Sequence, residues 1–147
     1  MALRDNLAEE MKLAMKARDE LRLSTIRMIR SAVKNRDIDL KRELDDREII
    51  EVISTLCKQR RESIRMFGEA GRNDLVAKEE KELAVLLDFL PRQLGRDEVA
   101  ALVDTAIAEC GAQGAKDMGK VMKALMPHVS GRADGKMVSD LVKEKLG

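Results

Sequence analysis

Aliphatic and methionine side chains recur every three or four residues along almost the whole chain, a spacing typical of amphipathic helices. One such stripe near the start consists of Leu3, Leu7, Met11, Ala14 and Met15. Only two prolines interrupt the 147 residues, and aromatic residues make up 1% of them. Because strands favour β-branched and aromatic residues, this pattern predicts an all-α fold.

Local signals mark where several of the helices begin and end. Asp45 and Glu48 have the spacing of a capping box at the start of a third helix. Gly71 is suited to end that helix, and Asn73 to cap a fourth. Pro91 should stop the fourth helix, since the residue before a proline is displaced from the α region.

The segment PRQLGRDE, residues 91–98, has the composition of a hinge or linker. It separates a predicted four-helix N-terminal lobe, residues 1–91, from a predicted three-helix C-terminal lobe, residues 97–147. A methionine stripe in the second lobe is interpreted as core, with a flexible groove for a partner as the alternative. It consists of Met118, Met122 and Met126.

The charge balance and the cysteines restrict the setting. Net charge is +1, so no overall field draws the chain to nucleic acid, and any basic surface must be local. Cys57 and Cys110 form no CxxC pair, and Cys57 falls on an apolar stripe typical of a buried free thiol. The sequence contains neither a bilayer-length apolar run nor a secretory leader. We therefore expect a cytoplasmic protein without a membrane partner.

The stretch HVSGRADGKM, residues 128–137, resembles a phosphate-binding loop but lacks its spacing. A P-loop needs G-x-x-x-x-G-K-[ST] after a strand, whereas this stretch is one residue short and follows a predicted helix. We interpret it as a joint in which Pro127 and Gly131 end one helix and Asp134 caps the next. Arg132 and Lys136 remain suited to bind a phosphate or carboxylate beside the new helix.

Other chemistry finds little support in the residue pattern. One histidine and two separated cysteines supply too few ligands for zinc. His128 has no cysteine at a spacing that suggests a nucleophile–base pair. Glu79, Glu80 and Glu82 alternate with lysines, which we interpret as a solvated face rather than an acid–base pair. We expect no catalytic residue, no metal and no cofactor.

Basic residues give a stronger signal. No acidic residue occurs from Leu21 to Arg36, and Arg27, Arg30 and Lys34 share one helical face. Similar sets recur further along the chain, at Lys58, Arg61, Arg65 and Arg72 and at Lys116, Lys120 and Lys123. Such stripes neutralise phosphates without reading bases, although an ordinary solvated face is the alternative. The lack of aromatic side chains for stacking favours backbone recognition of folded RNA over single strands.

Two segments resemble signatures of the YqeY family. AGRNDLVAKEEKELAVLLDFLPRQL, residues 70–94, is similar to AGR-x-D…E-x-x-E-L…LP-x-Q-L. MGKVMKALMPHVSGRADGKMVSDLVKEKL, residues 118–146, is similar to MG-x-V-M…GRADG…V…V-K-x-x-L. The same module forms the tail of GatB, a subunit of the glutamine-dependent amidotransferase that corrects mischarged tRNA.

The resemblance implies a two-lobe helical fold that holds tRNA and does not itself transfer an amide. The amidotransferase core of GatB has no counterpart here, so a carbon–nitrogen ligase label with glutamine as amido donor would be inherited from the larger enzyme. The positions that match the motifs are Gly71, Arg72, Glu79, Glu82, Leu90, Pro91, Met118, Gly119, Met122, Gly131, Arg132, Asp134 and Gly135. Many of these look structural; Gly119, for instance, can let helices approach closely.

Three functions stay open from the sequence. The first is a non-catalytic module that binds tRNA or other structured RNA, alone or beside an amidotransferase or aminoacylation component. Its candidate contacts are Arg27, Arg30, Lys34, Arg72, Lys120, Lys123, Arg132 and Lys136. The second is an enzyme, or an enzyme subunit, of amide transfer. The third is a helical adaptor for another protein that uses the methionine-rich C-terminal face.

Overall fold

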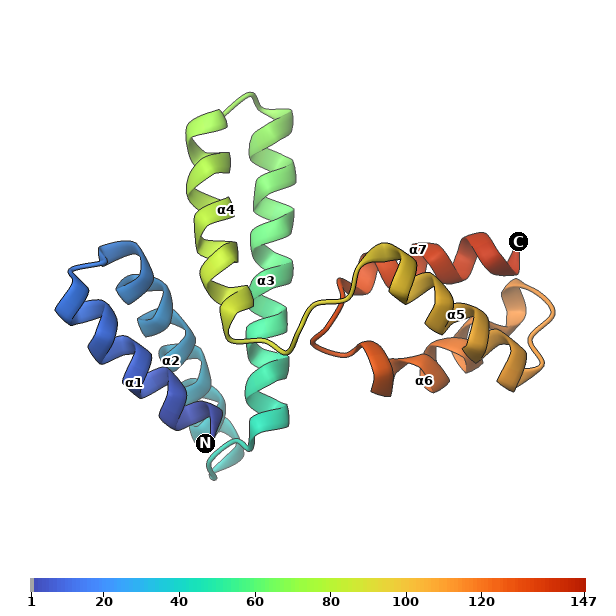
Figure 1. The fold of residues 1–147 in the computed structure, drawn as a ribbon, viewed down its shortest axis with the longest axis horizontal. Coiled ribbons are helices and arrows are strands. Elements are labelled where there is room, and N and C mark those ends of the chain that lie inside the picture. The colour runs from blue at the N-terminus through green and yellow to red at the C-terminus, as the bar shows by residue number, and fades with distance from the viewer. Residues whose placement is uncertain (1) are drawn as a thin grey trace. The chain divides into compact units, whose positions relative to one another are not determined.

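The computed structural model describes residues 2–147, and every regular element in this range is a helix (Figure 1). The prediction of an all-α fold is confirmed. The elements are α1 (Leu3–Ala17), α2 (Glu20–Leu40), α3 (Asp46–Glu69), α4 (Asn73–Asp88), α5 (Arg96–Cys110), the 3-10 turn η1 (Ala115–Asp117), α6 (Met118–Val129) and α7 (Gly135–Leu146). They form two compact units, one ending at Pro91 and one beginning at Arg92.

The N-terminal unit consists of two helical hairpins, α1–α2 and α3–α4, that pack around a core of aliphatic side chains (Figure 1). Helix α2 contributes Ile26 and Ile29, which are fully buried against Ile49 and Ile53 of α3. Met15 was expected in the inward stripe of α1 but is 50% exposed. Because a helix has 3.6 residues per turn, Met15 is rotated by about 100° from the buried Ala14 and therefore faces away from the core.

The predicted start and stop of α3 hold, and α4 ends before Pro91 as expected, but the cap predicted for the start of α4 does not hold. Asp45 and Glu48 form the expected capping box, and Gly71 follows α3 in the left-handed region with φ 71°. Asn73 is not a cap. It is the first residue of α4, whose N-cap is Arg72, because the left-handed turn at Gly71 brings the chain back to helical geometry one residue earlier.

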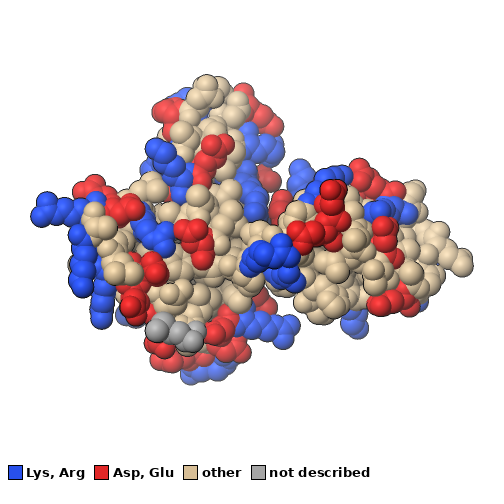
Figure 2. Space-filling model, in the orientation of Figure 1, with Lys and Arg blue, Asp and Glu red and all other residues tan. Residues whose placement is uncertain are grey.

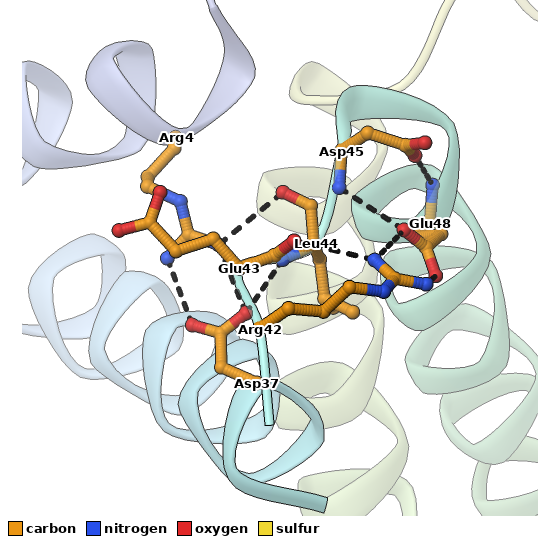
Figure 3. A network of polar contacts seen from close by, with 7 residues as sticks. All are labelled: Arg4, Asp37, Arg42, Glu43, Leu44, Asp45 and Glu48. Carbon is orange, nitrogen blue, oxygen red and sulfur yellow. Dashed lines mark hydrogen bonds and ion pairs between the residues drawn. The ribbon is translucent and has the colours of Figure 1, made fainter. Parts of the chain in front are cut away.

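A network of charged and backbone groups fixes the corner between α2 and α3 (Figure 3). Arg4 of α1 donates two hydrogen bonds of 3.0 Å to the carboxylate of Asp37. The same carboxylate accepts the Leu44 amide at 2.8 Å. Arg42 binds both oxygens of Glu48, at 2.7 and 2.8 Å, while Glu48 also accepts the amide of Asp45. The corner therefore joins three helices through charge-assisted hydrogen bonds.

A second ionic cluster, centred on Arg60, joins α3 to α4. It shows that the interpretation of Glu79 and Glu82 as solvated residues is wrong. Both were expected on a solvated face, yet their side chains are only 18% and 17% exposed. Arg60 Nε lies 2.8 Å from Glu82 and 3.2 Å from Glu79, and Arg60 Nη2 donates to the thioether of Met28. Oε2 of Glu79 accepts no hydrogen bond of good geometry, so its contact with Arg60 is one of charge. The sequence pattern predicted that Glu79 and Glu82 are solvated, but the packing of α4 on α3 largely excludes water from these two side chains.

The C-terminal unit packs α5, α6 and α7 around a second core that includes Val99, Leu125 and Val142. Met118 and Met122 lie half-buried against this core, whereas Met126 is 43% exposed. The methionine stripe is therefore mostly core.

Replacing Arg60 with Met should destabilise the N-terminal unit by about 3 kcal/mol, because two poorly solvated carboxylates lose their counter-charge. Arg65→Met is the matched control: Arg65 pairs with Glu62 and Glu69 on the same helix but is 50% exposed. It should cost less than about 1 kcal/mol. Urea unfolding followed by circular dichroism compares the two. Adding Glu79→Gln and Glu82→Gln to Arg60→Met should recover much of the loss; no recovery would contradict the role of charge.

Glu48 makes stability depend on pH in the acid range. The hydrogen bonds from Arg42, and then from the Asp45 amide, lower the pKa of Glu48 from 4.5 to about 2. A carboxyl whose pKa is lower in the folded state stabilises it above pH 4.5 and loses that contribution as pH falls toward 2. Glu48→Gln should therefore flatten the fall in the urea midpoint across this range. Glu51→Gln removes the same charge from an exposed position on α3 and should leave the pH dependence unchanged.

Candidate nucleic-acid interface

The basic stripe on α2 is exposed as the sequence predicts. Arg27, Arg30 and Lys34 all lie on the solvent side of the helix, while the opposite face buries Ile26, Ile29 and Val33. Arg27 and Lys34 make no ion pair within residues 2–147. They are seven positions apart, which corresponds to about 10 Å along the helix axis. Two unpaired cations at this separation are suited to bind successive anionic groups.

A groove of about 630 Å³ runs beside this stripe, between α1 and α2. Its apolar part comes from α1 and from the buried side of α2. The pair of Arg4 and Asp37 lines it as well. The complete lining is Arg4, Asp5, Leu7, Ala8, Met11, Arg27, Arg30, Ser31, Val33, Lys34 and Asp37. Since Arg4 and Asp37 neutralise each other, three cations and the single carboxylate of Asp5 leave the groove basic.

Arg30 reaches from α2 to α1 at this groove. Its Nη1 lies 2.9 Å from Sδ of Met11, a contact that directs the guanidinium over the α1 side. Met11 and Asp5 were not predicted as site residues, because the register of α1 against α2 is not visible in either helix alone. The inward stripe of α1, with Leu7 and Met11 one turn apart, was the available signal.

The basic set expected on α3 is largely occupied by intramolecular partners. Arg65 pairs with Glu62 and Glu69, at 3.0 and 2.9 Å. Arg72 pairs with Asp74 at 3.1 Å, and the resulting hydrogen bond lowers the pKa of the Asp74 carboxyl. Arg72 is thus already partnered, while the α2 stripe keeps its charge available. Figure 2 shows a column of basic side chains along the edge of the N-terminal unit where α1 lies, with mixed charges over much of the remaining visible surface.

The C-terminal unit carries its own exposed lysines. Lys120 and Lys123 lie on α6, and Lys136 lies in the first turn of α7. None of the three makes an ion pair within residues 2–147. The structure does not bring them into one cluster with the α2 stripe, since each set belongs to its own compact unit.

Arg132 does not point outward as an anion contact. It is half-buried, and its guanidinium donates to the carbonyls of Arg92 and His128, at 3.5 and 3.4 Å. Its own carbonyl accepts the Leu94 amide at 2.7 Å, and Gln93 donates to the Gly131 carbonyl at 2.8 Å. We call this group the linker latch. It attaches residues 92–94 to the joint between α6 and α7, so this part of the expected linker belongs to the C-terminal unit.

The joint itself differs in detail from the prediction. Asp134 caps α7 through the Lys136 amide, as expected. Pro127, however, lies inside α6, which continues to Val129. A proline in a last turn removes one intrahelical hydrogen bond but does not prevent the next residues from keeping helical geometry. Gly131 adopts φ 73° just after the helix, so the left-handed turn there needs a glycine.

Two motif glycines have no structural explanation within their own unit. Gly119 was expected to allow a close approach of helices, but a Cβ atom there would meet nothing within 4 Å. The same holds for Gly135 at the start of α7. The expectation for Gly119 is wrong because the second residue of α6 faces solvent and not a neighbouring helix.

Residues 2–147 contain no group of three or more His, Cys, Asp or Glu side chains that could hold a metal ion. Cys57 is a free thiol with 1% exposure, as predicted, and burial raises its pKa. A raised pKa disfavours the thiolate that a nucleophile requires. Within the described range no helix is both long and apolar enough to cross a bilayer.

Comparison with known proteins identifies the family. The family model described as "Yqey-like protein" matches residues 4–146. The chain belongs to the YqeY family. The latch gives the two signatures of this family a common structural basis here, because Gln93 and Leu94 of the first contact Gly131 and Arg132 of the second.

Curated relatives of this YqeY-family chain carry the name "Altered inheritance of mitochondria protein 41, mitochondrial". The one from Lachancea thermotolerans is 40% identical over 86 residues, 58% of this chain and 46% of the relative. The one from Kluyveromyces lactis is 41% identical over 101 residues, 66% of this chain and 54% of the relative. This chain thus spans about half the length of these two proteins. The relative from Pyrenophora tritici-repentis is 32% identical over 145 residues, 96% of this chain and 79% of the relative.

These names overturn the cytoplasmic setting expected from the sequence, since the similar proteins are named as mitochondrial. The expectation rested on the spacing of the two cysteines and on the polar character of the first ten residues of the sequence. Neither feature distinguishes the cytoplasm from another reducing compartment.

The latch assigns different roles to Arg132 and Lys136. Arg132→Ala should destabilise the C-terminal unit by about 1 kcal/mol, because two carbonyls lose a charged donor. Lys136→Ala should change stability by less than about 0.5 kcal/mol, as is usual for an exposed side chain without a partner. Hydrogen exchange of the Leu94 amide, which bonds to Arg132, should rise in the first variant only. Equal exchange in both variants would show that the side chain of Arg132 does not hold the latch.

Proposed function

We propose that this YqeY-family chain is a non-catalytic module that binds the phosphate backbone of tRNA or another structured RNA. The observation that carries the proposal is the α2 stripe, where Arg27 and Lys34 are exposed and make no ion pair within residues 2–147. Elsewhere in the N-terminal unit, arginines such as Arg65 and Arg72 are neutralised by neighbouring acids. Arg27 and Lys34 also line one basic groove together with Arg30, so a phosphate backbone that follows this groove can contact all three.

Structured RNA fits this stripe better than an unfolded strand. Phosphate contacts on one helix face position a ligand but read no bases. Sequence-tolerant binding of single strands usually relies on several stacked aromatic side chains, and this chain has two Phe, no Tyr and no Trp. Phe89, one of the two, is buried. Shape and backbone recognition of a folded RNA is the mode that remains.

The proposal extends to the C-terminal unit, where Lys120, Lys123 and Lys136 offer a second set of unpaired cations. In this proposal the N-terminal unit and the C-terminal unit each contribute lysine or arginine side chains that contact RNA phosphates. An adaptor role for the methionine stripe has less support, since Met118 and Met122 lie against the core. The burial of Cys57 and its raised pKa leave this thiol unsuited as a nucleophile. In this proposal the reaction itself, amide transfer or aminoacylation, belongs to a partner enzyme.

Replacing Arg27 and Lys34 together with Ala should weaken binding of deacylated tRNA and reduce its salt dependence. The slope of log affinity against log salt should fall by about 1.8, at about 0.9 per lost duplex phosphate contact. Fluorescence anisotropy titrations at several salt concentrations measure both quantities.

Lys78→Ala with Lys81→Ala provides the matched control, since both lysines are exposed on α4 and the variant loses the same charge. This variant should keep the wild-type slope. If both double variants lose affinity and slope equally, the effect is one of net charge and the α2 stripe is not the contact. Absence of salt-dependent tRNA binding by the wild-type chain would refute the function itself.

A further inference from the structure

The groove between α1 and α2 has features that phosphate contacts alone do not use. Leu7 and Val33 form part of its wall, and the side chains of Ala8 and Met11 are half-buried there. The charged phosphate groups of a nucleic-acid backbone gain nothing from apolar wall atoms. The occupant that suits both parts has an apolar, flat body joined to an anionic group.

The dimensions and the rim restrict that occupant further. A groove of about 630 Å³ lies in the range of small-molecule sites, about 300–1,000 Å³. Arg27 and Lys34 stand on its α2 side, where they can meet a phosphate. Ser31 and Asp5 supply a hydroxyl and a carboxylate, which are suited to the hydrogen-bonding edge of a base.

Arg30 supplies the flat surface that aromatic residues supply elsewhere. Its Nη1 lies 2.9 Å from Met11 Sδ, so the guanidinium reaches from α2 to α1 within the lining of the groove. Unstacked bases in RNA complexes pack on arginine guanidinium planes as well as on aromatic rings. The thioether of Met11 adds a polarisable contact of the kind that methionine makes with rings.

We propose that this groove binds one unpaired nucleotide, with its base against Arg30 and Met11 and the two phosphates that flank it against Arg27 and Lys34. The inference rests on the proposed function and adds a site for a single base to a surface that otherwise contacts the backbone. A loop nucleotide of the RNA suits the site, since its base is already unstacked and little pairing energy is lost. A free mononucleotide presents the same chemistry, and the experiments below separate the two sources.

The first experiment fills the groove without changing charge. Ser31→Leu places an apolar side chain in the lining, and Ser31 is exposed, so the fold should be kept. Ser24→Leu is the matched control: it is the same substitution at an exposed serine two turns earlier on α2, outside the groove. Ser31→Leu should weaken tRNA binding about fivefold to tenfold, the lower end of the range for one stacked base. The salt slope should not change, because no phosphate contact is removed.

The second experiment observes the groove directly. In protein labelled with ¹³C at the methionine methyl groups, the Met11 resonance is assigned by its loss in Met11→Leu. Titration with CMP should shift this resonance in the wild-type chain and in Ser24→Leu. The same concentration of inorganic phosphate should leave it in place, because phosphate brings no base ring to Met11.

The outcomes separate the nucleotide site from the proposed function. The site is supported for an RNA nucleotide if tRNA moves the Met11 resonance and Ser31→Leu lowers tRNA affinity at constant slope. If CMP moves the resonance but tRNA does not bind, the site takes a free nucleotide and the proposed function fails. If tRNA binds with the expected salt dependence while neither ligand moves Met11 and Ser31→Leu binds normally, the nucleotide site is refuted and backbone binding stands.

Discussion

Burial of one face of α2 determines which side chains this helix presents to solvent. Ile26 and Ile29 are fully buried and Val33 nearly so, and together they fix the rotation of the helix about its axis. Arg27, Arg30 and Lys34 lie on the opposite side of the helix and therefore face solvent. Rotating the helix to hide them would expose three large aliphatic side chains, at about 1.5–3 kcal/mol for each. The position of the basic stripe is thus a consequence of hydrophobic packing.

Helix packing also explains why the basic stripe on α2 is free to bind a ligand, whereas Arg60 and Arg132 are occupied by groups of the protein itself. Arg60 lies where α4 packs on α3, so Glu79 and Glu82 surround it and water is largely excluded. Arg132 lies where the chain enters the C-terminal unit, and backbone carbonyls occupy its guanidinium. Position relative to a neighbouring helix, and not residue type, decides whether a basic side chain serves the fold or a ligand.

The features that depend on neighbouring positions in the chain could be predicted from the sequence. Helical periodicity, the capping box at Asp45 and Glu48 and the cap at Asp134 are all set within a few residues. The exposed face of α2 also followed from its spacing. Features that depend on contacts between two helices were either not predicted or predicted wrongly. Glu79 and Glu82 read as solvated because Arg60 is about twenty residues earlier, and the groove is invisible until α1 is aligned with α2.

The corner between α2 and α3 has a consequence for the order of folding. Its hydrogen bonds join groups six and seven positions apart in the chain, as in Arg42 with Glu48 and Asp37 with Leu44. Arg60 and Glu82 are 22 positions apart, and Arg4 and Asp37 are 33 apart. Closing a short loop costs less chain entropy than closing a long one, and local contacts form sooner. The local hydrogen bonds of the corner can therefore form before the ion pairs of Arg4 and Arg60, which makes Asp37 a link between early and late contacts.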